Sequence, residues 1–371
     1  MKALLCGGGT AGHVMPAIAI AEILEKEFSG ITIAFAGRTN GSENNAYSET
    51  GHTLYTVDIS GIPRSLSTKG IKALLKILKS GKRARDIIKE FSPDIIIGTG
   101  GYVCYPFLRQ GQRLGIKTVM HESNVAPGLV TKILGPRCDK LLLNLEGTEK
   151  HLRKTENTLV VGNPLRKGFS TLTKSEAKRH LGIPESKKLI VSFGGSLGAE
   201  VLNSTVLAVM EDFIQSRDDV FHIHATGRSY YEKTASSHRK LAEKARNIRL
   251  VPYIEDMPTV LRAADIAITR SGAMTVSEIL KCATPSILIP SPNVTANHQY
   301  INAEYMQRQG ASVLIEEKDL TVEKLKSEIM ALLESGDKRK RMSASAKRIF
   351  TSDTDVRISK AIREVTGRKT S

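Results

Sequence analysis

The sequence predicts an α/β fold in which two doubly wound halves of similar size face each other across a cleft. Short β-branched runs alternate with stretches of helical periodicity along the whole chain, which is typical of parallel sheets covered by helices on both faces. These runs are too numerous for a single sheet. The segment Gly162-Asn163-Pro164, followed by a charged stretch over 166–188, is the best boundary because proline stiffens the crossing.

The expected strands are short apolar runs, each interpreted as a buried parallel strand. In the first half they lie at 4–5, 31–35, 95–97, 117–119 and 159–161, and in the second at 189–191, 221–223, 248–251, 266–268 and 286–289. Apolar residues recur at helical spacing between them, and after the first strand these are Ile18, Ala21, Ile23, Leu24 and Phe28.

Composition excludes several classes of protein. The 371 residues, 40% hydrophobic and 25% charged, suit about two globular domains and exclude a disordered chain. No apolar run approaches the roughly 20 residues of a membrane span, and the N-terminus turns glycine-rich by Gly7, too early for a signal peptide. The cysteines are widely spaced without a CxxC pair, which argues against a zinc ribbon or a disulfide framework. They are Cys6, Cys104, Cys138 and Cys282. We therefore expect a cytoplasmic protein with reduced thiols.

The charge indicates an anionic partner. Lys and Arg number 54 against 38 Asp and Glu, a net charge of +16, and segment 61–90 alone holds nine basic and two acidic residues. Nucleic acid, a phosphorylated ligand or an acidic lipid surface would each fit such an excess. A basic nucleic-acid-binding protein is the alternative from another class. However, the basic segment lacks interleaved aromatic residues for stacking on bases, so we expect no nucleic-acid partner.

Three glycine-rich turns follow expected strands, at 7–13, 98–102 and 194–199. Ligands of doubly wound sheets bind at the carboxyl ends of the strands, and a helix N-terminus behind a glycine turn attracts anions. The turns therefore predict phosphate binding, although each could be only a tight turn. The first also fits G-x-G-x-x-G, but the second strand ends without the acidic residue that a nicotinamide dinucleotide enzyme needs for the ribose.

Six motifs then carry a family resemblance. They are GGGTAGHVMPA from residue 7, GTGGYV at 98–103, HESN at 121–124, GNPLR at 162–166, GGSLGA at 194–199 and RSGAMTVSE at 270–278. In this order, and over nearly the whole chain, they closely resemble the MurG family, the lipid-linked N-acetylglucosaminyltransferases that complete the peptidoglycan precursor disaccharide. The resemblance implies two Rossmann-like domains of the GT-B glycosyltransferase type.

The resemblance also implies a reaction and a division of labour. GlcNAc would move from UDP-GlcNAc to the C4 hydroxyl of undecaprenyl-pyrophosphoryl-MurNAc-pentapeptide, converting lipid I to lipid II with inversion at the sugar. Residues 1–163, with a C-terminal helix at about 350–371 packing back, would bind the acceptor and its lipid. Residues 164–349 would bind UDP-GlcNAc. A related GT-B enzyme acting on another glycolipid is the alternative within this fold.

His13 is the candidate catalytic residue on the acceptor side. An alcohol is a poor nucleophile at neutral pH, and an imidazole titrates close to physiological pH, so His13 could act as the base. Alternatively, it caps a turn and orients the acceptor pyrophosphate. Expected substrate-binding residues around it are Thr10, Ala11, Gly12, Gly100, Gly101 and Tyr102.

His121 and Glu122 are expected to follow a strand and to face the cleft. Adjacent residues in an extended segment point to opposite sides, so a direct dyad between them is not expected. The resemblance places Asn124 against the sugar hydroxyls.

On the donor side, the resemblance assigns Glu278 to the two ribose hydroxyls. The alternative is an acid in the first turn of a helix that stabilises the helix dipole. The remaining expected donor contacts are Ser196 with a phosphate, Arg166 and Arg270 as charges, Tyr253 and Ile254 with the uracil edge, His298 and Gln299 with GlcNAc, and Asn203 and Ala273 as motif positions. No Asp-x-Asp occurs in the motifs, and loop amides, helix dipoles and arginines can neutralise the leaving UDP, so we expect neither a metal nor a cofactor.

Several positions depart from the family pattern. Ala11 replaces a glycine and requires a negative φ, while Ser123, Thr131 and His298 replace amides. Tyr105 is bulkier than the usual residue and could narrow acceptor specificity.

The basic segment predicts contact with a membrane surface. In 63–91 an apolar stripe at helical spacing is surrounded by basic residues, a pattern that suits anionic lipid headgroups. The stripe comprises Ile71, Leu74, Leu75 and Leu78, and the basic residues are Lys69, Lys72, Lys76, Lys79, Lys82, Arg83 and Arg85. We expect a peripheral protein on the anionic inner leaflet, at the cytoplasmic face of the membrane. Alternatively, the stripe packs on the first sheet.

Overall fold

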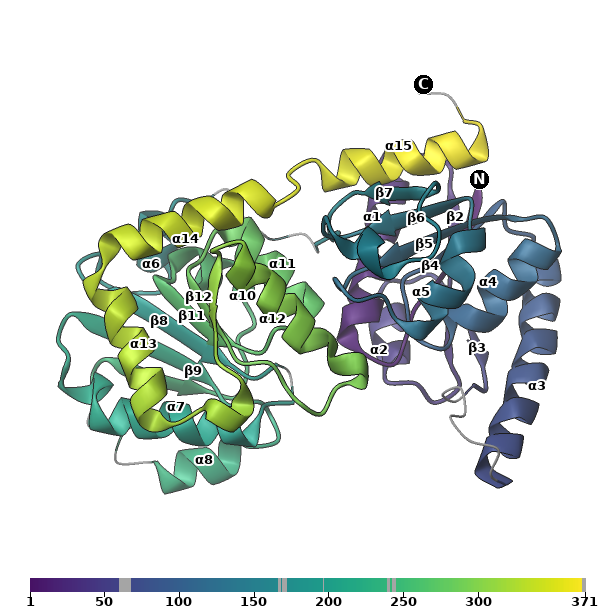
Figure 1. Ribbon diagram of the computed structural model, residues 1–371. Helices are drawn as coiled ribbons and strands as arrows, with labels where there is room; N and C mark the ends of the chain where they lie inside the picture. Colours follow the sequence, from purple (N-terminus) through teal and green to yellow (C-terminus); the bar gives the residue numbers. More distant parts are fainter. Residues whose placement is uncertain are drawn as a thin grey trace. The chain divides into compact units, whose positions relative to one another are not determined.

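A computed structural model describes residues 1–59, 68–165, 168, 172–195, 197–238, 241 and 245–368, with the backbone alone at 68–75, 77 and 235. The chain divides into two compact units, Met1–Lys167 with Thr351–Ser371, and Gly168–Phe350. Each unit contains one parallel sheet flanked by helices, so the predicted pair of α/β domains is confirmed (Figure 1). Within the described residues, none of the helices is long and apolar enough to cross a bilayer.

The first unit is built on a seven-stranded sheet of order β3-β2-β1-β4-β5-β6-β7. Its strands are β1 (Lys2–Cys6), β2 (Thr32–Arg38), β3 (Thr53–Val57), β4 (Ile95–Gly98), β5 (Lys117–Glu122), β6 (Lys140–Leu143) and β7 (Thr158–Val160). Its helices are α1 (Ala11–Glu27), α2 (Glu43–Ser48), α3 (Thr68–Phe91), α4 (Cys104–Arg113), α5 (Leu129–Leu134) and α15 (Thr354–Thr366), with short 3₁₀ turns at Gly135–Arg137 and Thr148–His151.

Helices cover both faces of this sheet because its strands are apolar on both sides. On one face, Ile20 and Leu24 of α1 share a core with Ile358 and Ile362 of α15. On the other face, α3, α4 and α5 pack over a second core. The C-terminal helix is therefore an integral part of the first unit, and Arg363 Nη2 ties it to the end of α1 through a hydrogen bond to Glu27 O.

The second unit has a six-stranded sheet of order β10-β9-β8-β11-β12-β13. Its strands are β8 (Lys188–Phe193), β9 (Val220–Ala225), β10 (Ile248–Val251), β11 (Ile266–Thr269), β12 (Ser286–Leu288) and β13 (Ser312–Leu314). Its helices are α6 (Lys174–His180), α7 (Glu200–Asp212), α8 (Tyr231–Ser237), α10 (Met257–Ala263), α11 (Ala273–Cys282), α12 (His298–Arg308), α13 (Val322–Glu334) and α14 (Gly336–Ile349). Its 3₁₀ turns are Ile214–Ser216, Thr295–Asn297 and Glu317–Asp319.

Three strands, β3, β6 and β13, are absent from the sequence prediction. β3 is an edge strand with mostly half-buried residues, so it lacks a continuous apolar run. β6 reads Lys-Leu-Leu-Leu, without the β-branched residues that favour a strand. β13 has only three residues.

Two buried histidines in the second unit share one serine. Ser192 Oγ on β8 lies 2.8 Å from His222 Nε2 and 2.8 Å from His224 Nδ1, both on β9. Burial lowers the pKa of both imidazoles, that of His224 from 6.5 to about 4. Both rings are therefore neutral in the folded protein near neutral pH.

This arrangement predicts a loss of stability in mild acid. Between pH 6.5 and about 4, unfolding allows His224 to bind a proton that the folded state does not bind. At about 1.4 kcal/mol for each pKa unit, His224 alone should lower the free energy of unfolding by about 3 kcal/mol across this window, and His222, whose pKa is also lowered, adds to the fall. In urea denaturation at several pH values, His224→Phe should reduce this pH dependence, with the His222 part remaining, whereas His180→Gln, at an exposed position, should not change it. The same pH slope in wild type and His224→Phe would contradict the assignment.

Candidate functional site

In the first unit, the predicted glycine turns meet where the strand order reverses. β1 lies between β2 and β4, so the turns after β1 and β4 emerge side by side at the carboxyl edge, where doubly wound sheets bind ligands. Gly8 N donates to Gly100 O at 3.3 Å. Gly101 has a φ of +81°, and a Cβ there would lie 2.1 Å from Gly8 O. The glycine at 101 is thus required by both conformation and space.

His13 is held against both turns. It is the third residue of α1, and its Nδ1 lies 3.0 Å from Gly8 O and 3.2 Å from Thr10 Oγ1. A carbonyl oxygen only accepts, so the hydrogen bond to Gly8 places the proton on Nδ1 and the lone pair of the neutral ring on Nε2. A Cβ at Gly100 would lie 2.4 Å from the His13 ring. The half-buried imidazole therefore has a defined tautomer and position.

The other residues expected around His13 are placed as follows. Ala11 and Gly12 open α1, and Ala11 has the negative φ that its replacement of glycine requires. Tyr102 is half-buried and packs against the core beneath α4, as does Tyr105. Cys104 Sγ lies 2.9 Å from Cys6 O and 3.0 Å from Gly100 O, so this thiol holds the second turn in place.

His121 and Glu122 are the last two residues of β5, which corrects the expectation that they follow the strand. Both side chains are buried. His121 Nε2 lies 3.0 Å from Gly162 O, and burial lowers the pKa of His121, so the ring is neutral and donates to this carbonyl. His121 therefore contacts the backbone of its own unit.

Glu122 organises the segment that carries Asn124. Its carboxylate accepts hydrogen bonds from Asn124 N at 3.0 Å, Gly128 N at 2.9 Å and Thr131 Oγ1 at 2.6 Å. Asn124 Nδ2 also donates to Glu122, at 3.2 Å. The family departure at Thr131 thus supplies a hydroxyl to the same carboxylate, and Ser123 Oγ donates to Asn163 Oδ1 at 3.2 Å.

In the second unit, the strand order reverses between β8 and β11. The turn at 194–199 leads into α7, and the turn at 270–272 leads into α11. A Cβ at Gly198 would lie 2.2 Å from Thr226 O, and Asn203 Nδ2 donates to the same oxygen at 2.8 Å. Asn203 therefore joins α7 to the end of β9. The predicted contacts Ser196 and Arg166 lie outside the described residues.

Glu278 is the sixth residue of α11, half-buried, in the second turn of the helix. The first turn of α11 contains no acidic residue. The alternative role of an acid stabilising the dipole in the first turn therefore does not apply to Glu278, because that effect falls off within one turn. Ala273 is the first residue of α11 and is buried.

Arg270 is engaged within its own unit. Its Nη1 donates to Ile289 O at 3.1 Å and to Pro290 O at 3.2 Å, and its Nη2 pairs with Glu317. These contacts fix the loop after β12 to the end of β11.

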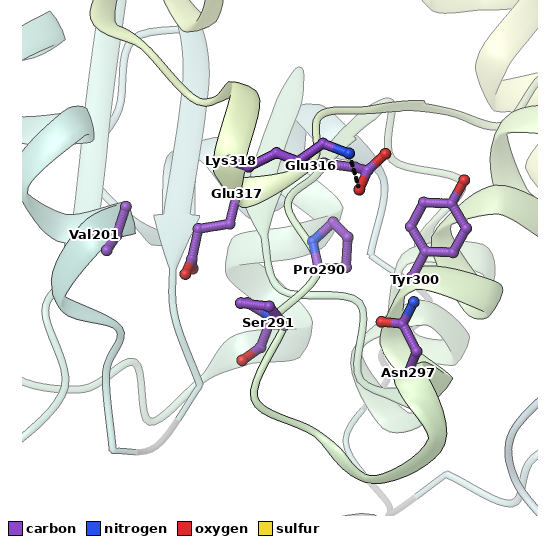
Figure 2. Close-up of a pocket in the computed structure, with 9 residues that line it drawn as sticks. Val201, Pro290, Ser291, Asn297, Tyr300, Glu316, Glu317 and Lys318 are labelled. Atoms are coloured by element: carbon purple, nitrogen blue, oxygen red, sulfur yellow. Dashed lines mark ion pairs between the residues drawn. The ribbon is translucent and has the colours of Figure 1, made fainter.

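A pocket of about 340 Å³ lies at the ends of β12 and β13, next to this ion pair (Figure 2). It is lined by Val201, Pro290, Ser291, Pro292, Asn297, Tyr300, Glu316, Glu317 and Lys318. Glu316 and Lys318 form an ion pair of 3.2 Å at its edge. Proline, valine and tyrosine supply apolar walls, and carboxylates and an amide supply hydrogen-bonding groups, a combination that suits a small polar ligand.

His298 and Gln299 begin α12 beside this pocket. Gln299 Oε1 accepts from Ser291 N at 2.9 Å, and His298 Nδ1 lies 2.8 Å from Thr295 O. Ala296 and Asn297, just before the helix, both have left-handed φ values of +56° and +51°. Strained non-glycine residues of this kind cluster at functional sites.

Tyr253 and Ile254 follow β10, as expected, with Pro252 between the strand and Tyr253. Ile254 is buried, and the Arg228 guanidinium stands 5.2 Å from the centre of the Tyr253 ring. In the part of the chain that the structure describes, no three His, Cys, Asp or Glu side chains are grouped where they could hold a metal ion.

Some supporting residues have no sequence prediction. Glu43 and Tyr47 on α2 both contact the first glycine turn. Gly9 N donates to Glu43 Oε2 at 3.4 Å, and Tyr47 Oη donates to Gly7 O at 2.8 Å. The sequence offers one local signal for Glu43. It is an acidic residue a few positions beyond the second strand, and not at the strand end, where a dinucleotide-binding enzyme has its acid.

Comparison with known proteins places both units. Residues 3–143 match the glycosyltransferase family 28 N-terminal domain, and residues 189–358 match the glycosyltransferase family 28 C-terminal domain. The crystal structure of Acinetobacter baumannii MurG has a TM-score of 0.77 and 24% identity, covering 98% of this chain and 99% of that chain. This likeness supports the GT-B type of fold.

Two relatives carry the name UDP-N-acetylglucosamine–N-acetylmuramyl-(pentapeptide) pyrophosphoryl-undecaprenol N-acetylglucosamine transferase. The protein from Acetivibrio thermocellus is 39% identical over 368 residues, 98% of each chain. The protein from Thermoanaerobacter sp. is also 39% identical over 368 residues, covering 99% of this chain and all of its own. The chain therefore belongs to the MurG family of N-acetylglucosamine transferases.

Proposed function

We propose that this protein transfers GlcNAc from UDP-GlcNAc to the C4 hydroxyl of MurNAc in undecaprenyl-pyrophosphoryl-MurNAc-pentapeptide, with inversion at the sugar. The observation that carries the proposal is the 39% identity, along nearly the full length of both chains, to transferases named for these substrates. The glycine turns at both strand-order reversals supply the anion-binding edges that two diphosphate-linked substrates need.

The first unit binds the acceptor in this proposal. His13 Nε2 takes the proton from the C4 hydroxyl while the hydroxyl oxygen bonds to C1 of GlcNAc, and UDP leaves with the electron pair of the broken bond. The hydrogen bond from Nδ1 to Gly8 O stabilises the imidazolium that forms. Asn124, held by Glu122, contacts the acceptor or the transferred sugar.

The second unit binds the donor. Glu278 accepts hydrogen bonds from the ribose hydroxyls, the backbone at Tyr253 and Ile254 contacts uracil, and Gln299 lies by the sugar at the edge of the pocket. In this proposal the amide groups at the start of α7 and α11 bind the diphosphate, with Ser196 as a further expected contact. Arg270 contributes by fixing the loop at 289–290, because its guanidinium is already engaged there.

The proposal is tested by acceptor-dependent release of UDP. Purified protein with UDP-GlcNAc and lipid-linked MurNAc-pentapeptide should release UDP and form the lipid-linked disaccharide. A diacylglycerol acceptor in a parallel reaction should give no product. Transfer to diacylglycerol, without transfer to the MurNAc lipid, would favour the alternative glycolipid acceptor.

We also propose that the protein docks on the anionic inner leaflet through α3, where its lipid-linked acceptor resides. Leu78 on this helix is 65% exposed, and Lys79, Lys82, Arg83 and Arg85 around it are exposed. Further along, Ala84, Ile87, Ile88 and Phe91 pack into the core, so this end of the helix is anchored to the sheet. The side chains of Lys69, Ile71, Lys72, Leu74 and Leu75 lie outside the described residues.

Reversing three of these charges should release the protein from anionic vesicles. Each basic residue near the headgroups contributes about 1 kcal/mol, so changing Lys79, Lys82 and Arg83 to Glu should weaken vesicle binding by at least about 10²-fold. UDP affinity should stay unchanged. The control carries the same charge change on α14 of the other unit, at the exposed Lys340, Arg341 and Lys347. If both triple variants lose vesicle binding equally, or if neither loses it, α3 is not the docking surface.

A further inference from the structure

A buried carboxylate lies directly beneath the first glycine turn. Glu43 opens α2 and is only 2% exposed. Its Oε1 accepts from Arg38 N and Arg38 Nε, each at 3.0 Å, and its Oε2 accepts from Arg38 Nη2 at 3.1 Å and Gly9 N at 3.4 Å. All four partners are donors, so only the ionised carboxylate satisfies them together.

The charge on this carboxylate is retained under ordinary conditions. Burial opposes ionisation, but the hydrogen bonds from the Arg38 side chain and from the backbone outweigh it and lower the pKa of Glu43 to about 2. The Arg38 side chain, at the carboxyl end of β2, is 35% exposed and neutralises the buried charge from the solvent side.

The surrounding chain leaves space for the Glu43 side chain. A Cβ at Gly8 would lie 2.5 Å from Glu43 Oε1, and a Cβ at Gly41 would lie 2.4 Å from Glu43 Cδ. One turn along α2, Tyr47 Oη donates to Gly7 O at 2.8 Å, and the Tyr47 ring stacks on Phe35 with centroids 4.4 Å apart. Helix α2 therefore holds the glycine turn at Gly7 and at Gly9.

Gly8, between these two anchors, carries the carbonyl that accepts from His13 Nδ1 at 3.0 Å. The position of Gly8 sets both the tautomer and the direction of the imidazole. We propose that Glu43 is a positioning residue that acts through the backbone of Gly8 and Gly9 to orient His13. The kinetic part of this inference rests on the proposed function of His13, whereas the effect on the His13 ring does not.

A purely structural role for Glu43 predicts a different outcome. Loss of a structural contact lowers the free energy of unfolding and leaves the folded fraction with its normal kcat. Loss of positioning lowers kcat in fully folded protein, because a displacement of about 1 Å at a reacting group can cost about 10²-fold in rate. Donor affinity is unaffected in the second case, since Glu43 belongs to the unit that does not bind UDP-GlcNAc.

The test variant is Glu43→Gln, which keeps the shape of the side chain. In either orientation, its amide NH₂ faces two donors, either Arg38 N and Nε or Gly9 N and Arg38 Nη2. The matched control is Asp139→Asn. Asp139 accepts from Thr118 N at 2.8 Å and pairs with Lys117 at 3.1 Å, but it lies at the amino edge of the same sheet, away from the turns.

Two measurements are made at a temperature where each variant is folded. We expect Glu43→Gln to lower kcat by about 10²-fold with an unchanged Kd for UDP. We expect ¹⁵N NMR of histidine-labelled protein to show that His13 loses its fixed Nδ1-protonated tautomer. Asp139→Asn should keep the wild-type kcat and the wild-type His13 signals. Should Glu43→Gln not fold, Glu43→Asp keeps the charge but withdraws it from Gly9, and the same two changes are expected in smaller measure.

The outcomes separate this inference from the proposed function. Wild-type protein that transfers no GlcNAc overturns the proposed function, and the ¹⁵N signals of His13 still test the positioning. Unchanged His13 signals in the folded Glu43 variant overturn the inference. A matching fall in kcat for Asp139→Asn also overturns it, because the effect would then follow stability rather than position.

Discussion

Replacing His13 by alanine should lower kcat by about 10²–10⁴-fold, the usual contribution of a general base. The Kd for UDP-GlcNAc should stay at the wild-type value, because His13 lies in the first unit. The imidazole is held with its proton on Nδ1, so Nε2 carries the lone pair that accepts a proton. Single-turnover kinetics with saturating lipid acceptor would measure this step directly.

His151→Ala is the control for this prediction, since His151 is an exposed residue in a 3₁₀ turn of the same unit. It should behave as wild type. A different result for His13→Ala would assign another role to the residue. If the loss appears wholly in KM for the acceptor, with kcat preserved, His13 orients the acceptor pyrophosphate and another group is the base.

Replacing Glu278 by alanine should weaken binding of UDP-GlcNAc without unfolding the protein. Hydrogen bonds to a charged group contribute about 1.5–3 kcal/mol, so the Kd should rise by about 10–10²-fold. Because Glu278 is half-buried on α11 and the first turn of that helix has no acid, a dipole effect does not account for such a loss. Isothermal titration calorimetry with UDP-GlcNAc and with UDP provides the measurement.

A second carboxylate on a helix of the same unit serves as the control. Glu334→Ala, at the exposed end of α13, should leave the Kd unchanged. If Glu278→Ala binds UDP-GlcNAc as tightly as wild type, the ribose assignment is wrong. Deoxyribose-UDP gives a second comparison between wild type and variant. If Glu278→Ala weakens the binding of UDP and of deoxyribose-UDP by the same factor, the ribose hydroxyls are not its partners.

The glycine turns could be predicted because local sequence determines them. Each one follows a short apolar strand, and parallel strands place their carboxyl ends at a common edge. The contact between Gly8 and Gly100 follows from that rule alone, once β1 and β4 are neighbours. His13 is predictable for the same reason, since it is the last residue of the first turn.

The contacts of the charged residues could not be predicted, because their partners are distant in sequence. Arg270 was expected near the nucleotide diphosphate, yet its guanidinium binds Ile289 O, Pro290 O and Glu317. His121 binds Gly162 O, 41 residues further along the chain. No local pattern distinguishes a histidine or arginine with such a partner from one that faces a ligand.

Helix α2 illustrates a second limit. Its six residues, Glu43–Ser48, are mostly polar and show no helical stripe, so neither the helix nor Glu43 stands out in the sequence. Their importance comes from packing, since Glu43 and Tyr47 reach Gly9 and Gly7 from below.

The docking of α15 on α1 has a consequence for biosynthesis. Ile358, Ala361, Ile362 and Val365 of the last helix complete a core whose other members lie in the first half of the chain. The first domain therefore cannot close its core until residue 365 has left the ribosome, whereas the second domain is complete at Phe350. Domains made in one piece usually mature in the order of their synthesis. Here the later domain finishes first, and the first domain keeps part of its core exposed until α15 has been synthesised.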